Sequence, residues 1–144
     1  MEELYNLIIG LFLLMEVTNV FALYFRKNSK RFNSTGVFNQ YAESAKDPHL
    51  RNFVDYLINW VAGTKIIFIT IIVVVVLYAD KTTKIFVTLA LILSILTFYL
   101  GLYPLVKKMD KAGQLDPHGY SKMLFIMITI FVLVLGIGLL NLFV

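Results

Sequence analysis

Four long apolar stretches divide the chain, and most polar residues gather between them. The stretches cover residues 4–25, 58–79, 85–106 and 123–144. At about 1.5 Å per residue, a helix of this length extends about 33 Å and matches a hydrocarbon core of about 30 Å. The pattern therefore predicts an all-α, polytopic membrane protein. We expect a single domain, residues 1–144, folded as a four-transmembrane-helix bundle.

Basic residues are distributed unequally among the connecting segments. Residues 26–51 contain six Lys/Arg and residues 107–122 contain four, whereas the turn around Asp80 contains only Lys81 and Lys84. Loops rich in Lys/Arg remain cytoplasmic. We therefore expect both long loops to be cytoplasmic and both termini to lie on the non-cytoplasmic side. Placed this way, the net charge of +4 indicates membrane orientation rather than nucleic-acid binding.

Two Asp-Pro-His tripeptides directly precede the second and fourth stretches, at residues 47–49 and 116–118. Asp as N-cap followed by Pro at the first helical position is a standard helix start. The pattern therefore predicts a helix beginning at Pro48 and another at Pro117. A metal site made of both histidines and both aspartates is the remote alternative. The chain has no cysteine, so no thiolate metal site is expected.

A second helix that begins at Pro48 and ends near Ala79 would be about 48 Å long, so its first turns would project from the membrane. Asn52, Asp55 and Asn59 follow one another at helical spacing and share one face of this projecting part. Two interpretations remain open. The face is either wetted by the cytoplasm or lines a groove against a neighbouring helix.

Small side chains form a stripe along the third apolar stretch. Ala90, Ser94, Thr97 and Gly101 fall on one helix face. Because small residues let membrane helices approach closely, the stripe predicts packing within the chain or between subunits. Pro104 lacks a backbone N–H, and we expect it to bend the helix near Tyr103.

One acid, Glu16, lies within the first apolar stretch, and one base, Lys65, lies within the second. Glu16 is about 13 Å from the inner end of its stretch and Lys65 about 10 Å from the same end of the next. The two residues thus lie at similar depth on antiparallel helices. Charges in the bilayer usually find partners, so we predict an intramembrane polar pair. Asn19 extends the face of Glu16 by one turn.

Three interpretations of the pair remain open. It fixes the register of two helices, or it lines a polar cavity for a headgroup or cofactor. The third is that Glu16 binds protons or cations in a small transporter or channel. A membrane acid in the first of four short helices is similar to the small multidrug transporters.

The layout as a whole resembles the MAPEG family of membrane-bound glutathione and eicosanoid proteins. In "DPHLRNFVDYLINW", Asn59 follows Asp47-Pro48 at a spacing similar to that of some members, although Arg51-Asn52 stands where the family has Glu-Arg. The family has an arginine in its third span, whereas the inner end of the third stretch here has Tyr103. The resemblance implies a homotrimer, binding sites between subunits near the inner leaflet, and glutathione as a cofactor.

These observations predict a small homo-oligomeric membrane protein that contacts membrane lipid. It would bind lipid or another hydrophobic ligand, or act as an assembly subunit. A glutathione-dependent membrane transferase and an ion-coupled transporter centred on Glu16 are the alternatives. The residues expected to line a ligand cavity are Asn19, Asp55, Asn59 and Tyr103. No metal ligand set and no catalytic grouping is predicted.

Overall fold

A computed structural model describes residues 2–31 and 33–143 and contains four helices long and apolar enough to cross a membrane. They are α1 (Glu2–Phe25), α3 (Pro48–Tyr78), α4 (Lys81–Leu100) continued by α5 (Leu102–Lys111), and α6 (Tyr120–Asn141). Between α1 and α3 lie η1 (Thr35–Val37), α2 (Asn39–Glu43) and η2 (Ser44–Lys46). By the length and composition of its helices, the fold fits an integral multi-pass membrane protein. Val144, the last residue of the fourth predicted stretch, lies outside the described residues.

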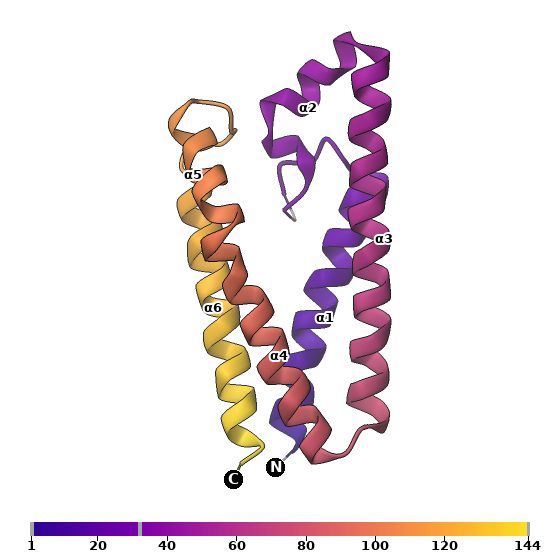
Figure 1. The fold of residues 1–144 in the computed structure, drawn as a ribbon, viewed down its shortest axis with the longest axis vertical. Helices are drawn as coiled ribbons and strands as arrows, with labels where there is room; N and C mark the ends of the chain where they lie inside the picture. Colours follow the sequence, from indigo (N-terminus) through magenta and orange to yellow (C-terminus); the bar gives the residue numbers. More distant parts are fainter. Residues whose placement is uncertain (1, 32, 144) are drawn as a thin grey trace.

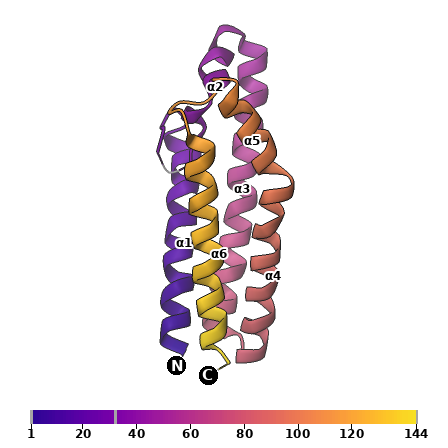
Figure 2. The same cartoon turned by 90° about the vertical axis from the view of Figure 1, so that its left-hand side faces the viewer.

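The helices form two hairpins, α1 with α3 and α4–α5 with α6. Both termini lie beside the turn between α3 and α4, which we call the terminal end of the bundle (Figure 1). At the opposite end, which we call the loop end, lie α2, α5 and the long connections (Figures 1 and 2). The hairpins lie close together at the terminal end and diverge toward the loop end (Figure 1).

The apolar core is continuous where the two hairpins lie close together and divides where they diverge. At the terminal end, buried side chains of all four long helices form one cluster, among them Ile9, Ile72, Leu91 and Leu135. Toward the loop end the core divides in two. One cluster joins α1, α2 and α3, and another joins η1, α5 and α6. Phe38 packs against both, so the loop after α1 connects the two hairpins.

The helix α3 begins where the sequence predicts. Asp47 is its N-cap, with the carboxylate accepting hydrogen bonds from the backbone N–H groups of His49 and Leu50, and Pro48 is its first residue. Its 31 residues correspond to a length of about 46 Å.

The predicted start of the last helix at Pro117 is wrong. The helix α6 begins at Tyr120, and Asp116 is instead used by the loop contacts, where it pairs with Lys30. Asp110, the single acid of α5, takes over the capping role. Its carboxylate accepts hydrogen bonds from the backbone N–H groups of Gly119 at 3.0 Å and Ser121 at 2.9 Å.

The third apolar stretch is not one uninterrupted helix. It is broken at Gly101, between α4 and α5, three residues before Pro104. The missing N–H of Pro104 is the one that would reach the carbonyl group four residues earlier, that of Leu100, and the helix breaks there. The stripe of Ala90, Ser94, Thr97 and Gly101 is exposed, so it does not serve packing within the chain.

The turn between α3 and α4 is also shorter than predicted. Asp80 is the N-cap of α4, and its carboxylate accepts a hydrogen bond from the backbone N–H of Thr83 at 3.0 Å. Hydrogen bonds from Thr83 hold the pKa of the Asp80 carboxyl below its usual value. Because α4 begins at Lys81, Lys84 lies within the helix rather than in a turn.

Candidate functional site: an apolar groove beside an ion pair

Glu16 and Lys65 lie together in the seam between α1 and α3. The Lys65 ammonium donates a hydrogen bond to Glu16 Oε2 at 2.6 Å. The two side chains are 18% and 29% exposed, respectively, so the pair lies at the edge of the seam rather than in its centre. Ala62 of α3 is fully buried in a cluster with Val20 and Leu23 of α1, and its small side chain lets the two helices approach closely.

An apolar groove of about 570 Å³ runs along the surface between α1 and α3. Val17 and Ile66, the chain neighbours of Glu16 and Lys65, both line it. Its wall is almost entirely hydrocarbon and aromatic ring, formed by Val17, Val20, Phe21, Tyr24, Phe25, Ile66, Ile69 and Thr70. Such a wall can hold an acyl chain or another long apolar molecule through the burial of nonpolar surface. A smaller hollow of about 330 Å³ is lined by Lys65 and three preceding residues of α3.

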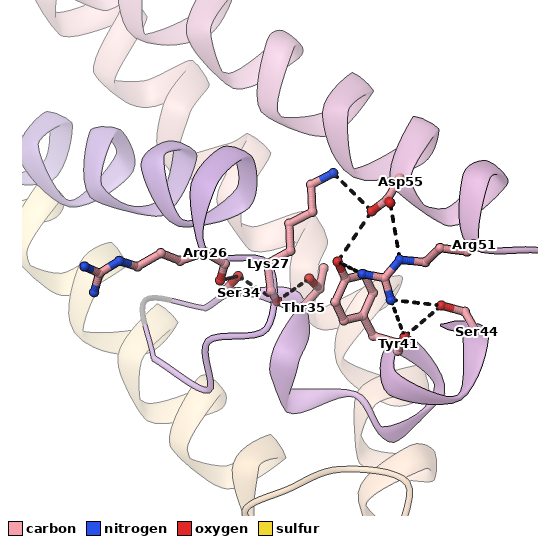
Figure 3. A network of polar contacts seen from close by, with 8 residues as sticks. All are labelled: Arg26, Lys27, Ser34, Thr35, Tyr41, Ser44, Arg51 and Asp55. Atoms are coloured by element: carbon pink, nitrogen blue, oxygen red, sulfur yellow. Dashed lines mark hydrogen bonds and ion pairs between the residues drawn. The ribbon is translucent and has the colours of Figure 1, made fainter. Parts of the chain in front are cut away.

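Asp55 does not line this groove. It accepts hydrogen bonds from the Lys27 ammonium at 3.0 Å and from Arg51 Nε at 3.2 Å, and it thereby ties the end of α1 to α3 (Figure 3). The Arg51 guanidinium lies 3.9 Å from the centre of the Tyr41 ring and donates to the Tyr41 carbonyl at 3.0 Å. Burial raises the pKa of the Tyr41 hydroxyl, and the Asp55 carboxylate raises it further.

The loop that follows α1 folds back on the two residues directly after that helix. The hydroxyl groups of Ser34 and Thr35 donate to the backbone carbonyl groups of Arg26 and Lys27 (Figure 3). A side chain at Gly36 would meet the Asn28 carbonyl oxygen at 2.1 Å, so only glycine fits there. The hydroxyl groups of Ser34 and Thr35 thus hold this loop in an ordered turn against the end of α1.

Asn19 belongs to a second polar contact, which joins α1 to the loop and to α6. Its side-chain amide donates to the Asn33 carbonyl at 3.0 Å, and the Asn33 side chain accepts a hydrogen bond from the Tyr120 hydroxyl. The two long loops also bond directly. The backbone N–H of Asn39 donates to the Gln114 carbonyl at 3.0 Å, and that of Asp116 to the Val37 carbonyl at 2.9 Å.

The remaining predicted residues lie elsewhere. Asn59 is exposed on α3, outside the groove. Tyr103 lies on the other hairpin, where its ring packs 5.1 Å from that of Phe125 and 6.4 Å from that of Tyr99. The structure thus brings Glu16 and Lys65 together and leaves Asn19, Asp55, Asn59 and Tyr103 in separate surroundings. Among the described residues, no group of three or more His, Asp or Glu side chains is placed to hold a metal ion.

A further ion pair, which the sequence analysis does not predict, lies at the terminal end. Lys84, whose side chain is 7% exposed, donates to Glu2 Oε2 at 2.8 Å. One turn further along, the hydroxyl groups of Tyr5 and Thr88 lie 3.1 Å apart. Asp80 followed by Thr83 is the signal that would have placed Lys84 inside the helix, since it marks a helix start.

Comparisons with protein families, with curated proteins and with solved structures give no match to the chain. The resemblance to the MAPEG family therefore remains one of layout. Any functional conclusion depends on the site itself.

Proposed function

We propose that this chain is a small multi-pass membrane protein that binds a lipid chain, or a hydrophobic ligand of similar shape, in the groove between α1 and α3. The observation that supports this function is the groove itself, about 570 Å³ in volume and walled by apolar side chains of two long helices. Clefts that bind small molecules are mostly apolar and of this size. The ion pair of Glu16 and Lys65 holds the two walls in register.

The proposed orientation has the loop end in the cytoplasm, in agreement with the Lys/Arg content of the long loops. We also propose that the protein is a homo-oligomer. The most apolar parts of α3 and of α4–α5 are each only 11% buried within one chain, and the exposed stripe of small residues on α4 suits close packing with another helix.

The alternatives receive less support. Glu16 already has a cationic partner at 2.6 Å, which favours a structural role over the carriage of protons or cations. The transferase receives less support at the segment that resembles the family motif, because Arg51 and Lys27 there both pair with Asp55 and are not available to an acidic peptide.

Filling the groove tests the proposal. Ile69→Trp places a large ring in the groove, whereas Ile67→Trp, as matched control, changes a residue of the same helix that is 63% exposed and does not line it. Native mass spectrometry after mild detergent extraction reads both the lipids retained per chain and the number of chains per particle. We expect Ile69→Trp to retain fewer lipids than the unchanged protein and Ile67→Trp to retain the same number. Equal retention in all three would contradict the groove as a lipid site.

A further inference from the structure

The helix α5 carries a basic face beside exposed leucines. Lys107, Lys108 and Lys111 are all exposed, and their spacing places them within one side of the helix. Leu102 and Leu105, in the preceding turns, are each 54% exposed. Val106 is 2% exposed and belongs to the cluster that α5 shares with α6. The helix therefore presents both charge and hydrocarbon away from the protein.

The positive charge of this face is not balanced within the described residues. The ion pairs found there use Lys27, Lys30, Arg51, Lys65 and Lys84, and none involves a lysine of α5. The one acid of α5, Asp110, is occupied by Gly119 and Ser121 at the start of α6. Three cations thus remain available to an outside anion.

The position of α5 places this face near a membrane surface. It continues α4, one of the helices apolar enough to cross a bilayer, after the break at Gly101. Tyr99 and Tyr103 lie at the junction, and the Lys107 ammonium lies 5.8 Å from the centre of the Tyr103 ring. Tyrosines mark the interface between hydrocarbon and water, and lysines just beyond it meet lipid headgroups.

We infer that the lysine face of α5, formed by Lys107, Lys108 and Lys111, binds anionic phospholipids together with the exposed Leu102 and Leu105 on the adjoining side of the helix. The exposed leucines contact the upper acyl chains, and the three ammonium groups contact the phosphate and its neighbouring negative charge. Charge complementarity selects this occupant over a zwitterionic lipid, whose own cation opposes the lysines. The site lies on the hairpin of α4–α5 and α6, away from the α1–α3 groove. A negative result at one site therefore does not count against the other.

The test uses an indole placed one turn before Lys108, beside the lysine face. Leu105→Trp is made together with Trp60→Phe, which removes the only tryptophan of the chain. The full chain is reconstituted into phosphatidylcholine vesicles that contain a minor fraction of brominated phosphatidylglycerol or, in parallel, of brominated phosphatidylcholine. Quenching of the indole by bromine reports which lipid lies beside α5.

We expect the relative binding constant to favour phosphatidylglycerol by about five-fold or more, the effect of roughly one lysine at an anionic surface. Added salt should reduce this preference. The triple variant Lys107→Gln, Lys108→Gln and Lys111→Gln should bring the ratio close to one, whereas the triple exchange of the same lysines for arginine should keep it.

A charge-matched control removes three other exposed cations, through Arg31→Gln, Lys46→Gln and Lys81→Gln. This control should keep the preference, because α5 is unchanged. Equal quenching by the two lipids in the lysine-bearing protein would overturn the proposal. So would a preference that survives the glutamine exchanges on α5, or one that the control variant loses.

Discussion

Glu16→Gln is expected to lower the free energy of unfolding by on the order of 2 to 3 kcal/mol, the cost of leaving a charge without its partner in the bilayer. The exchange removes the carboxylate that Lys65 contacts at 2.6 Å and leaves an ammonium within an apolar seam. Lys65→Met should have an effect of similar size because it strands the carboxylate. Reversible unfolding in mixed micelles, followed by circular dichroism, measures both.

The double variant distinguishes an interacting ion pair from two residues that contribute to stability independently. Replacing both partners of a buried ion pair by groups of similar size is often nearly neutral. Glu16→Gln with Lys65→Met should therefore recover much of the loss seen in either single variant. Lys81→Met, which removes an exposed lysine at the first position of α4, serves as the control and should leave the stability unchanged. A double variant less stable than both single variants would rule out the pair.

Gly138→Leu is expected to destabilise the seam between α1 and α6 by about 1 to 3 kcal/mol, the usual cost of overpacking a filled core. A Cβ at Gly138 would already lie 3.4 Å from Ile8 Cγ2 and 3.5 Å from Ile8 Cδ1. The further carbons of leucine would have to push Ile8, which is 7% exposed, out of its place. The same unfolding measurement detects the loss.

Gly136 provides the matched control, because it lies on the same helix two residues earlier. A Cβ there would meet nothing within 4 Å. Gly136→Leu should therefore be neutral or slightly stabilising, since leucine favours a helix more than glycine does. Equal destabilisation by both exchanges would mean that the loss comes from replacing glycine in α6 and not from contact with Ile8.

Features that depend on length, spacing or depth could be predicted from the sequence. Most of each apolar stretch lies on a long helix, the third on α4 and its continuation α5, and α3 begins at Pro48 because Asp47 and Pro48 satisfy the first turn without help from elsewhere. The contact between Glu16 and Lys65 follows from equal depth on sequential antiparallel helices, where few other partners exist.

Features that depend on which loop meets which helix could not be predicted. The motif at Asp116 looks the same as that at Asp47, but its carboxylate pairs with Lys30, eighty-six residues away in the chain, and Asp110 caps α6 instead. The polar helix face that Asp55 shares with Asn52 and Asn59 predicts a cavity residue, but it does not reveal the ion partner of Asp55. Its partner Lys27 comes from a loop whose path no local pattern reveals.

The groove itself also lay beyond sequence reasoning. Its walls are residues of two helices that differ little from other lipid-facing residues in type. What forms the groove is the packing of α1 on α3, which places Phe21 and Tyr24 of one helix beside Ile66 and Ile69 of the other.

Lipid binding in the α1–α3 groove is tested most directly by photolabelling in membranes. The probe is a phospholipid that carries a diazirine in its acyl chain, and peptide mapping then locates the labelled residues. We expect labelling concentrated on the groove, at residues such as Phe21, Tyr24, Ile66 and Ile69, and displaced by excess unlabelled lipid. Labelling spread evenly over exposed apolar side chains of the other helices, such as Leu93 and Leu133, and unaffected by excess lipid would contradict it.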